Sequence, residues 1–392
     1  MKSPVYTIFY KELLENFRDR KTVMNALIIG PLIGPLILAL ILSTVISRET
    51  KRAEKPLELP VIGAEHAPTL INFLRTQNVE IQPGPKDPIA AVKAQDHNVV
   101  MRLDAEFGKA FQAGDPAPVE LIYDSSQRDG ESDQQRITSI LDRYGRTVGA
   151  MRLVARGVHP GLINPIATVD RDQASPEARG AMILGFLPYV LVLGAFMGGM
   201  YLAIDTTAGE RERQSLEPLL ANPVPRWQIM AGKLLATSAF AIGSLVVTLV
   251  AFAVIMPMLP LKQLGFKFNF GIVVFLQMLV ALGPVVLLAS AVQTSIAAYA
   301  KSFREAQSWL GLLNIIPAIP SMILMVVPTK PVLWMFAVPL LGQHHAVMKL
   351  VRNETITNME WGVLMGSGLL LALIVSWIAA RIYNRENLAI SA

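Results

Sequence analysis

Six long runs without Asp, Glu, Lys or Arg constrain this 392-residue chain more than any other feature. Each has at least about 20 residues, the length that an α-helix needs to cross the hydrocarbon core of a membrane. Only 17% of the residues are charged and 52% are hydrophobic, a composition too apolar for an ordinary soluble protein. We therefore predict a mainly α-helical membrane protein with six transmembrane helices, at Val23–Ser47, Ala181–Ile204, Leu234–Leu261, Phe268–Ala300, Ala306–Thr329 and Trp361–Ala380.

The charges that flank these runs predict the orientation of the chain. The N-terminal leader and the stretches after the second, fourth and sixth runs hold thirteen Lys and Arg residues, whereas the short connections on the other side hold five. Basic residues collect on the cytoplasmic side of membrane proteins. We therefore expect both termini and the segment 205–233 to be cytoplasmic.

Residues 1–22, before the first transmembrane helix at 23–47, predict an amphipathic cytoplasmic helix. Apolar residues recur at three- and four-residue spacing over Pro4–Lys21, with charged residues between them. Such a helix lies in the interface of the inner leaflet. It is either a simple membrane anchor or a surface that holds a cytoplasmic partner. The first run is too long, and lies behind too long a polar leader, for a cleaved signal peptide.

About 130 residues separate the first two runs, and residues 48–179 are therefore predicted to form an extracytoplasmic domain with its own core. Short β-branched runs alternate with helical stretches, which predicts a small α/β domain with a mixed sheet. The expected strands are Leu59–Gly63, Val79–Gln82, Asn98–Leu103, Val119–Tyr123 and Ile166–Val169. The expected helices are Ala67–Gln77, Asp87–Ala94, Ala105–Ala113 and Gly130–Arg156.

The chain has no cysteine, so no disulfide holds this domain. Residues 48–180 carry 17 basic and 19 acidic residues, and the basic surplus therefore lies in the membrane part, where it contacts anionic lipids. Nothing here favours a nucleic-acid partner. The acidic cluster from Asp124 to Asp133 matches no calcium loop and is interpreted as turn and helix-capping residues. His66, His97 and His159 are isolated, and no metal site is predicted.

Residues 328–351 predict a re-entrant helical hairpin before the sixth helix. Three prolines divide two apolar stretches, each too short to cross a membrane. The adjacent His344 and His345 would point about 100° apart on a helix, so one metal ion cannot easily bind both. We interpret them as a pair at the membrane interface.

No catalytic constellation is visible. The sequence lacks a phosphate-binding loop, a serine-nucleophile elbow and a zinc-protease motif, so an intramembrane enzyme has no candidate nucleophile or metal. The runs also lack the buried carboxylates of ion-coupled secondary transporters. Their polar residues are interpreted as donors and acceptors between helices: Gln277, Gln293, Thr294 and Asn314.

The segment Gly209–Leu235, GERERQSLEPLLANPVPRWQIMAGKLL, is the charged hinge between the second and third helices. We read Gly209–Leu220 as one helix with a charged first turn and an apolar side, followed by a proline-rich turn. A solvated loop would need neither the apolar side nor so compact a structure. The pattern predicts a rigid element that docks on a partner.

This segment resembles the signature of type-2 ATP-binding-cassette export permeases (the ABC-2 family), in particular the sodium-efflux (NatB-like) branch. The matching residues are Gly209, Glu210, Arg211, Glu212, Ser215, Leu216, Glu217, Leu219, Leu220, Pro223, Gly232 and Lys233. Serine stands for threonine at 215, and Pro218 departs from the pattern in a way that changes the expected helix geometry. Three further segments are similar to the family: Lys11–Thr22, the start of the fifth span with Glu305, Ala306 and Gln307, and Ala380–Asn387.

The resemblance implies a permease without enzyme activity, in a bacterial cytoplasmic (inner) membrane. It would bind no cofactor itself, and ATP and Mg²⁺ would bind a separate ABC ATPase subunit, with two copies of each subunit. The implied coupling residues are Gly209, Glu210, Arg211, Glu212, Arg213, Glu217, Leu220, Pro223, Gly232 and Lys233. The Glu and Arg residues among them would contact the ATPase surface. Export of sodium is the implied function, although drugs, lipids or peptides fit equally well. The alternative is a membrane sensor or scaffold with an extracytoplasmic ligand-binding domain, which would need a long cytoplasmic output domain.

Overall fold

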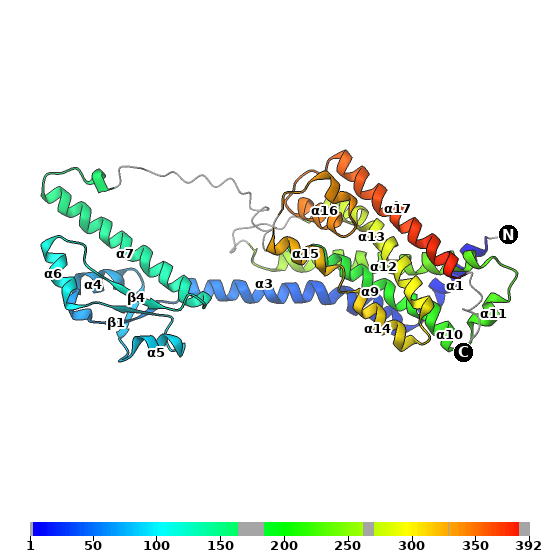
Figure 1. Ribbon diagram of the computed structural model, residues 1–392, viewed down its shortest axis with the longest axis horizontal. Helices are drawn as coiled ribbons and strands as arrows, with labels where there is room; N and C mark the ends of the chain where they lie inside the picture. Colours follow the sequence, from blue (N-terminus) through cyan, green and yellow to red (C-terminus); the bar gives the residue numbers. More distant parts are fainter. Residues whose placement is uncertain (1–2, 164–183, 262–269, 328, 384–392) are drawn as a thin grey trace. The chain divides into compact units, whose positions relative to one another are not determined.

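A computed structural model describes residues 3–163, 184–261, 270–327 and 329–383 (Figure 1). The chain divides into two compact units. The first comprises residues 1–48 and 173–392, and the second comprises residues 49–172. The predicted strand at Ile166–Val169 lies outside the described residues.

Six helices in the described residues are long and apolar enough to cross a membrane, as predicted. Their positions are Arg20–Ser47, Leu187–Glu212, Arg226–Met258, Ile272–Tyr299, Phe303–Leu324 and Asn358–Arg381. The first unit contains the following α-helices, of which α3 continues into the second unit. They are α1 (Pro4–Arg18), α2 (Arg20–Val23), α3 (Gly30–Glu54), α9 (Leu187–Ile204), α10 (Glu210–Glu212), α11 (Leu216–Leu220), α12 (Arg226–Ile255), α13 (Ile272–Tyr299), α14 (Phe303–Leu313), α15 (Ala318–Val326), α16 (Leu341–Val351) and α17 (Asn358–Tyr383).

The N-terminal amphipathic stretch is not one helix. Ser3 caps α1, and its hydroxyl accepts a hydrogen bond from the Tyr6 N–H at 3.3 Å. Helix α1 ends at Arg18 because Asp19 leaves the helical conformation and caps α2 with its carboxylate. The Thr22 hydroxyl donates to that carboxylate at 2.7 Å, which lowers the pKa of Asp19. A π-helical turn, η1 (Met24–Ile29), then joins α2 to α3.

Helix α9 is the most deeply buried of the six spans and lies against α12 and α13 (Figure 1). Glycine permits the close approach to α12: a Cβ atom at Gly198 would stand 2.1 Å from the Cβ of Ser244. The Ser244 hydroxyl donates to the Gly194 carbonyl at 2.6 Å. Small residues four apart allow membrane helices to pack at this distance.

The fifth span is broken. Helix α14 ends at Leu313, turns follow, and α15 begins at Ala318. Pro317 has no N–H to continue the hydrogen bonds of α14. Pro320 lies in the first turn of α15, where an N–H group would have no intrahelical acceptor, so a proline costs no hydrogen bond there. Proline therefore divides this span where the sequence predicts one continuous helix.

After the fifth span the chain forms a 3₁₀ turn, η7 (Leu333–Ala337), and then α16. Helix α16 is buried against α13, and His344 and His345 are both less than 10% exposed. Ser321 of α15 and the Nδ1 atom of His344 are 2.9 Å apart. The two histidines are thus packed inside the helical unit. That this region re-enters the membrane stays a prediction.

The second unit contains a four-stranded sheet in the order β2-β1-β3-β4. Strand β1 (Leu57–Ile62) pairs in parallel with β2 (Val79–Pro83) and β3 (Val99–Arg102), and β4 (Glu120–Tyr123) is antiparallel to β3. The helices are α4 (Pro68–Thr76), α5 (Pro88–Lys93), α6 (Ala105–Ala113) and α7 (Arg128–Ala155). All these bounds lie within two residues of the predicted ones.

One core holds this unit together. Alternate residues of β1 and β3, such as Leu59 and Met101, pack against Leu70 and Leu74 of α4 and Ile137 of α7. All five are buried. Because side chains alternate along a strand, Val100 lies on the opposite face of β3, where it is also buried. Helix α5 contacts this strand.

Candidate functional site

The hinge between the second and third spans consists of separate short helical pieces. Helix α9 passes through a π-helical segment, η4 (Asp205–Gly209), into α10, which ends at Glu212. Gln214 then has a left-handed backbone with φ 58°, and α11 begins at Leu216. The prediction of one continuous helix from Gly209 to Leu220 is therefore wrong.

Pro218 gives the physical reason for the break. It is the third residue of α11, and the N–H groups of a first helical turn have no intrahelical acceptor. In a helix that began at Gly209, the proline would lack a needed donor and its ring would meet the carbonyl of Gln214. The helix that contains Pro218 must therefore begin near Leu216.

Lys233 of α12 is the centre of a charge cluster that comprises Lys11, Glu12, Glu15, Glu210 and Lys233. Its side chain is 0% exposed, and its ammonium group donates to the Glu210 carboxylate and to the Thr206 carbonyl. Oε1 of Glu12 lies 3.9 Å from the same nitrogen. The side chains of Glu12 and Glu210 are only 3% and 7% exposed, so the cluster joins α1, α10 and α12 through buried charges.

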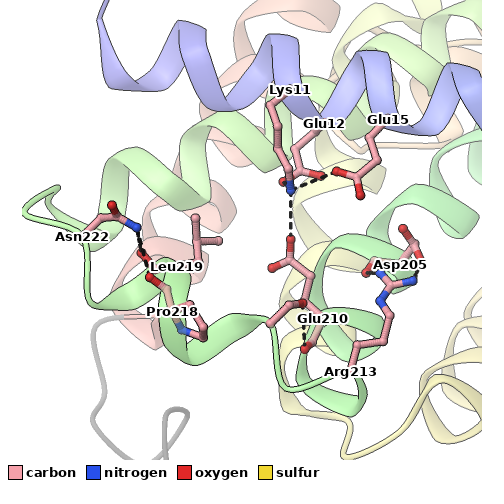
Figure 2. A pocket seen from close by; sticks show the side chains of 10 residues that line it. Lys11, Glu12, Glu15, Asp205, Glu210, Arg213, Pro218, Leu219 and Asn222 are labelled. Atoms are coloured by element: carbon pink, nitrogen blue, oxygen red, sulfur yellow. Dashed lines mark hydrogen bonds and ion pairs between the residues drawn. The ribbon is translucent and has the colours of Figure 1, made fainter.

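Lys11 covers the cluster on the solvent side. Its ammonium nitrogen is 3.1 Å from Oε1 of Glu12, 3.1 Å from Oε2 of Glu15 and 3.5 Å from Oε1 of Glu210. Figure 2 shows Lys11 and Glu15 pointing from α1 toward Glu210 across a pocket of about 480 Å³. The other wall of the pocket comes from the hinge, with Arg213, Ser215 and Asn222 among its residues.

Burial and charge act in opposite directions on this cluster. Burial raises the pKa of the Glu12 carboxyl group more than the positive charges of Lys233 and Lys11 lower it. Partial burial lowers the pKa of Lys11, but the charges and hydrogen bonds of Glu12 and Glu15 outweigh it, and the pKa of Lys11 is raised. Lys11 therefore stays charged at neutral pH and compensates the buried carboxylates.

Arg211 and Glu212 connect α10 to α13 and α14. The Arg211 guanidinium donates to the carbonyls of Ala298 and Ala300, each at 3.0 Å, at the C-terminal end of α13. Oε2 of Glu212 accepts from the Phe303 N–H, at the start of α14, at 2.8 Å. The C-terminal end of a helix has unpaired carbonyls and a partial negative charge, which favour the cation of Arg211. The N-terminal end has unpaired N–H groups and a partial positive charge, which favour the anion of Glu212. The two side chains thus satisfy two neighbouring helix ends.

Two other signature positions serve close packing. A Cβ atom at Gly232 would stand 2.7 Å from Cγ2 of Ile8 and 3.0 Å from the carbonyl oxygen of Val5, so glycine lets α1 lie directly on α12. Leu216 of α11 is buried beside Ile229 and Met230 of α12. The apolar side predicted for the hinge is present at this position.

The remaining predicted site residues lie outside the buried charge cluster. Arg213 pairs with Asp205 at 3.0 Å but is 57% exposed, and Pro223 is exposed in the turn before α12. Glu305 accepts from the Lys301 N–H at 2.7 Å and so closes the turn before α14, whose N-cap is Ser302. Gln307 is exposed on that helix. The side chains of Glu217 and Leu220 lie outside the described residues.

The inward face of α1 carries buried polar residues that the amphipathic pattern does not predict. Ile8, Glu12 and Asn16 recur every four residues, and the last two are buried, with the Asn16 amide donating to the Glu12 carbonyl at 2.9 Å. Residue type alone predicts that the charged residues of this helix face solvent. The four-residue spacing from Ile8 was the available signal that Glu12 lies on the packed face.

Polar side chains inside the spans link neighbouring helices. The Gln293 amide of α13 donates to the Phe196 carbonyl of α9 at 2.8 Å, and the Asn314 amide lies 3.5 Å from Sδ of Met200. Thr294 instead bonds the Ser290 carbonyl in its own helix. Gln293 and Asn314 thus agree with the helix-to-helix interpretation.

Comparison with known proteins agrees with this architecture. The model of the ABC-2 family of transporter proteins matches residues 26–380. The chain is also 26% identical over 355 residues to the ABC transporter permease protein NatB of Bacillus subtilis (strain 168), which covers 88% of this chain and 89% of that protein. The family match extends from within the first span, through the hinge, to residue 380 in the sixth span. The chain is a transmembrane permease of the ABC transporter class, and it belongs to the ABC-2 family.

Proposed function

We propose that this chain couples ATP hydrolysis by a separate ABC ATPase subunit to export across the bacterial cytoplasmic membrane. One observation carries the proposal. The charged hinge is joined by buried or capping interactions to α1, α12, α13 and α14. A displacement of the hinge by a partner would therefore reach several spans together, which is what a coupling element requires.

The hinge has an inner and an outer part in this proposal. Glu210 and Arg211 face the protein and transmit force, so they are not the residues that touch the ATPase. The exposed residues that follow, such as Gln214, Pro218 and Asn222, would form the docking surface. This differs from the expectation that the Glu and Arg residues of the signature contact the ATPase. The reason is that burial in the charge cluster makes the Glu210 carboxylate inaccessible.

Sodium is the first substrate to test, because the hinge sequence resembles the sodium-efflux branch of the family. Proteoliposomes that contain the permease and its partner ABC ATPase should export ²²Na⁺ only with hydrolysable ATP and Mg²⁺. A lipophilic dye in parallel vesicles tests the competing substrate class. ATP-dependent movement of the dye without sodium would reject sodium, and movement of neither would count against the exporter itself.

Introduced cysteines provide a test of the topology, because the natural chain has none. We expect Asn222→Cys to react with a membrane-impermeant maleimide only in inside-out vesicles. Ser139→Cys, exposed on α7 of the sheet-containing unit, should react only from the outside of intact cells. Labelling of both cysteines from one side would contradict the proposed arrangement of the hinge and the α/β domain.

The same two variants test the docking surface. A bulky polyethylene-glycol maleimide on Asn222→Cys should abolish co-purification of the ATPase and transport-linked ATP hydrolysis, because it occupies the exposed part of the hinge. The same label on Ser139→Cys is the matched control and should change neither. Normal ATPase binding by the labelled Asn222→Cys protein would remove the hinge from the interface.

A further inference from the structure

A second cavity, separate from the charge cluster, lies between α12 and α17. These two helices contact each other. It is a groove of about 790 Å³, large enough for a hydrocarbon chain. Most of its surface is apolar, with leucines from three helices: Leu234, Leu235, Leu287, Leu369 and Leu373.

The polar groups of this groove lie at one end. Trp227 stands at the start of α12, and Trp377 and Arg381 stand in the last turns of α17. The guanidinium carbon of Arg381 lies 3.9 Å from the centre of the Trp377 ring, which holds the cation beside the opening. Both tryptophans are at least half exposed. Tryptophan is enriched where a protein crosses the membrane–water interface.

The length of the groove corresponds to one leaflet. Leu369 and Arg381 are twelve residues apart on α17, or about 18 Å along the helix axis at 1.5 Å per residue. Half of a hydrocarbon core of about 30 Å is about 15 Å. A ligand that fits this groove therefore has a charged or polar head at the Arg381 end and an apolar tail one leaflet long.

We propose that this groove binds an anionic phospholipid of the leaflet at the Arg381 end, which is the cytoplasmic leaflet in the proposed topology. The phosphate of the headgroup pairs with the Arg381 guanidinium, and the tryptophan rings lie beside the glycerol region. One acyl chain follows Leu234, Leu373 and Leu369. Charge selects the ligand, since arginine at the surface attracts anionic lipid and leaves a zwitterionic lipid with little advantage. The site requires only that α12 and α17 span the membrane, and it is independent of ATP coupling.

Lipid retention tests the site. The purified permease is delipidated and reconstituted in nanodiscs of equal parts dioleoylphosphatidylglycerol and dioleoylphosphatidylcholine, and tightly bound lipid is counted by native mass spectrometry. We expect the permease to retain phosphatidylglycerol in preference to phosphatidylcholine, and Arg381→Gln to reduce that preference about fivefold. Arg304→Gln, an exposed arginine of α14 that does not line the groove, is the matched control and should keep the preference.

A second variant separates the tail from the headgroup. Ala231→Phe places a ring in the apolar part of the groove and should reduce retention of both lipids. Equal retention of the two lipids by the natural protein, or an unchanged preference in Arg381→Gln, would overturn the proposal. So would efficient disulfide cross-linking of two Leu373→Cys copies in membranes, because the groove would then face a second copy of the chain.

Discussion

Lys233→Met is expected to lower the free energy of unfolding by about 3–5 kcal/mol, since it leaves buried carboxylates without their partner. Glu210 loses the ammonium group to which it is bonded, and Glu12 loses a positive charge 3.9 Å away. The Thr206 carbonyl also loses its lysine donor. Thermal unfolding of the purified protein in detergent, followed by tryptophan fluorescence, measures the loss.

The double variant Lys233→Met with Glu210→Gln gives the decisive comparison. It removes both charges of the central pair, whereas Glu12 keeps Lys11 at 3.1 Å, so we expect most of the lost stability to return. Arg213→Gln serves as the control, because its pair with Asp205 is partly exposed and should contribute less than about 1 kcal/mol. If the double variant is as unstable as Lys233→Met, the loss does not come from the uncompensated charges.

Gly198→Val is expected to destabilise the packing of α9 on α12 by about 1–3 kcal/mol, the cost of forcing extra atoms into a packed core. Its Cβ atom would stand 2.1 Å from the Cβ of Ser244, and the Phe240 carbonyl is only 3.3 Å from the same point. The backbones must therefore separate, which also threatens the hydrogen bond from Ser244 to Gly194. A lower unfolding temperature in detergent is the expected reading.

Two variants test this explanation. Gly366→Val is the matched control on α17, where an added Cβ meets nothing within 4 Å, so we expect a smaller effect. Ser244→Gly combined with Gly198→Ala should recover much of the stability, because it removes the atom that clashes. A loss of stability in Gly366→Val as large as that in Gly198→Val would point to the helix propensity of glycine and valine, and not to packing.

Much of the fold followed from patterns that are local in the sequence. The length of the charge-free runs predicts the spans, because a helix must satisfy its own backbone in the membrane. Alternation of strands and helices places the elements of the α/β unit within two residues. Local patterns were insufficient at the hinge. They predict one helix from Gly209 to Leu220, whereas the chain leaves the helical conformation at Gln214.

The partners of the signature residues could not be read from the sequence either. Glu12 and Lys233 are separated by more than two hundred residues, and the Arg211 acceptors lie at the end of α13. Charge alone suggests that such residues face water or a partner protein. Their burial depends on helices that meet only in the folded chain.

The sequence by itself determined the number of spans, the class of the sheet-containing unit and the segment that carries the family signature, because each depends on the solvation of contiguous residues. The tertiary structure decided what the signature residues contact. It places Lys233 between Glu12 and Glu210, sets Arg211 and Glu212 on neighbouring helix ends, and brings α1 onto Gly232. These interactions are long-range in the sequence, and whether a charge is buried or solvated depends on which helix ends meet around it.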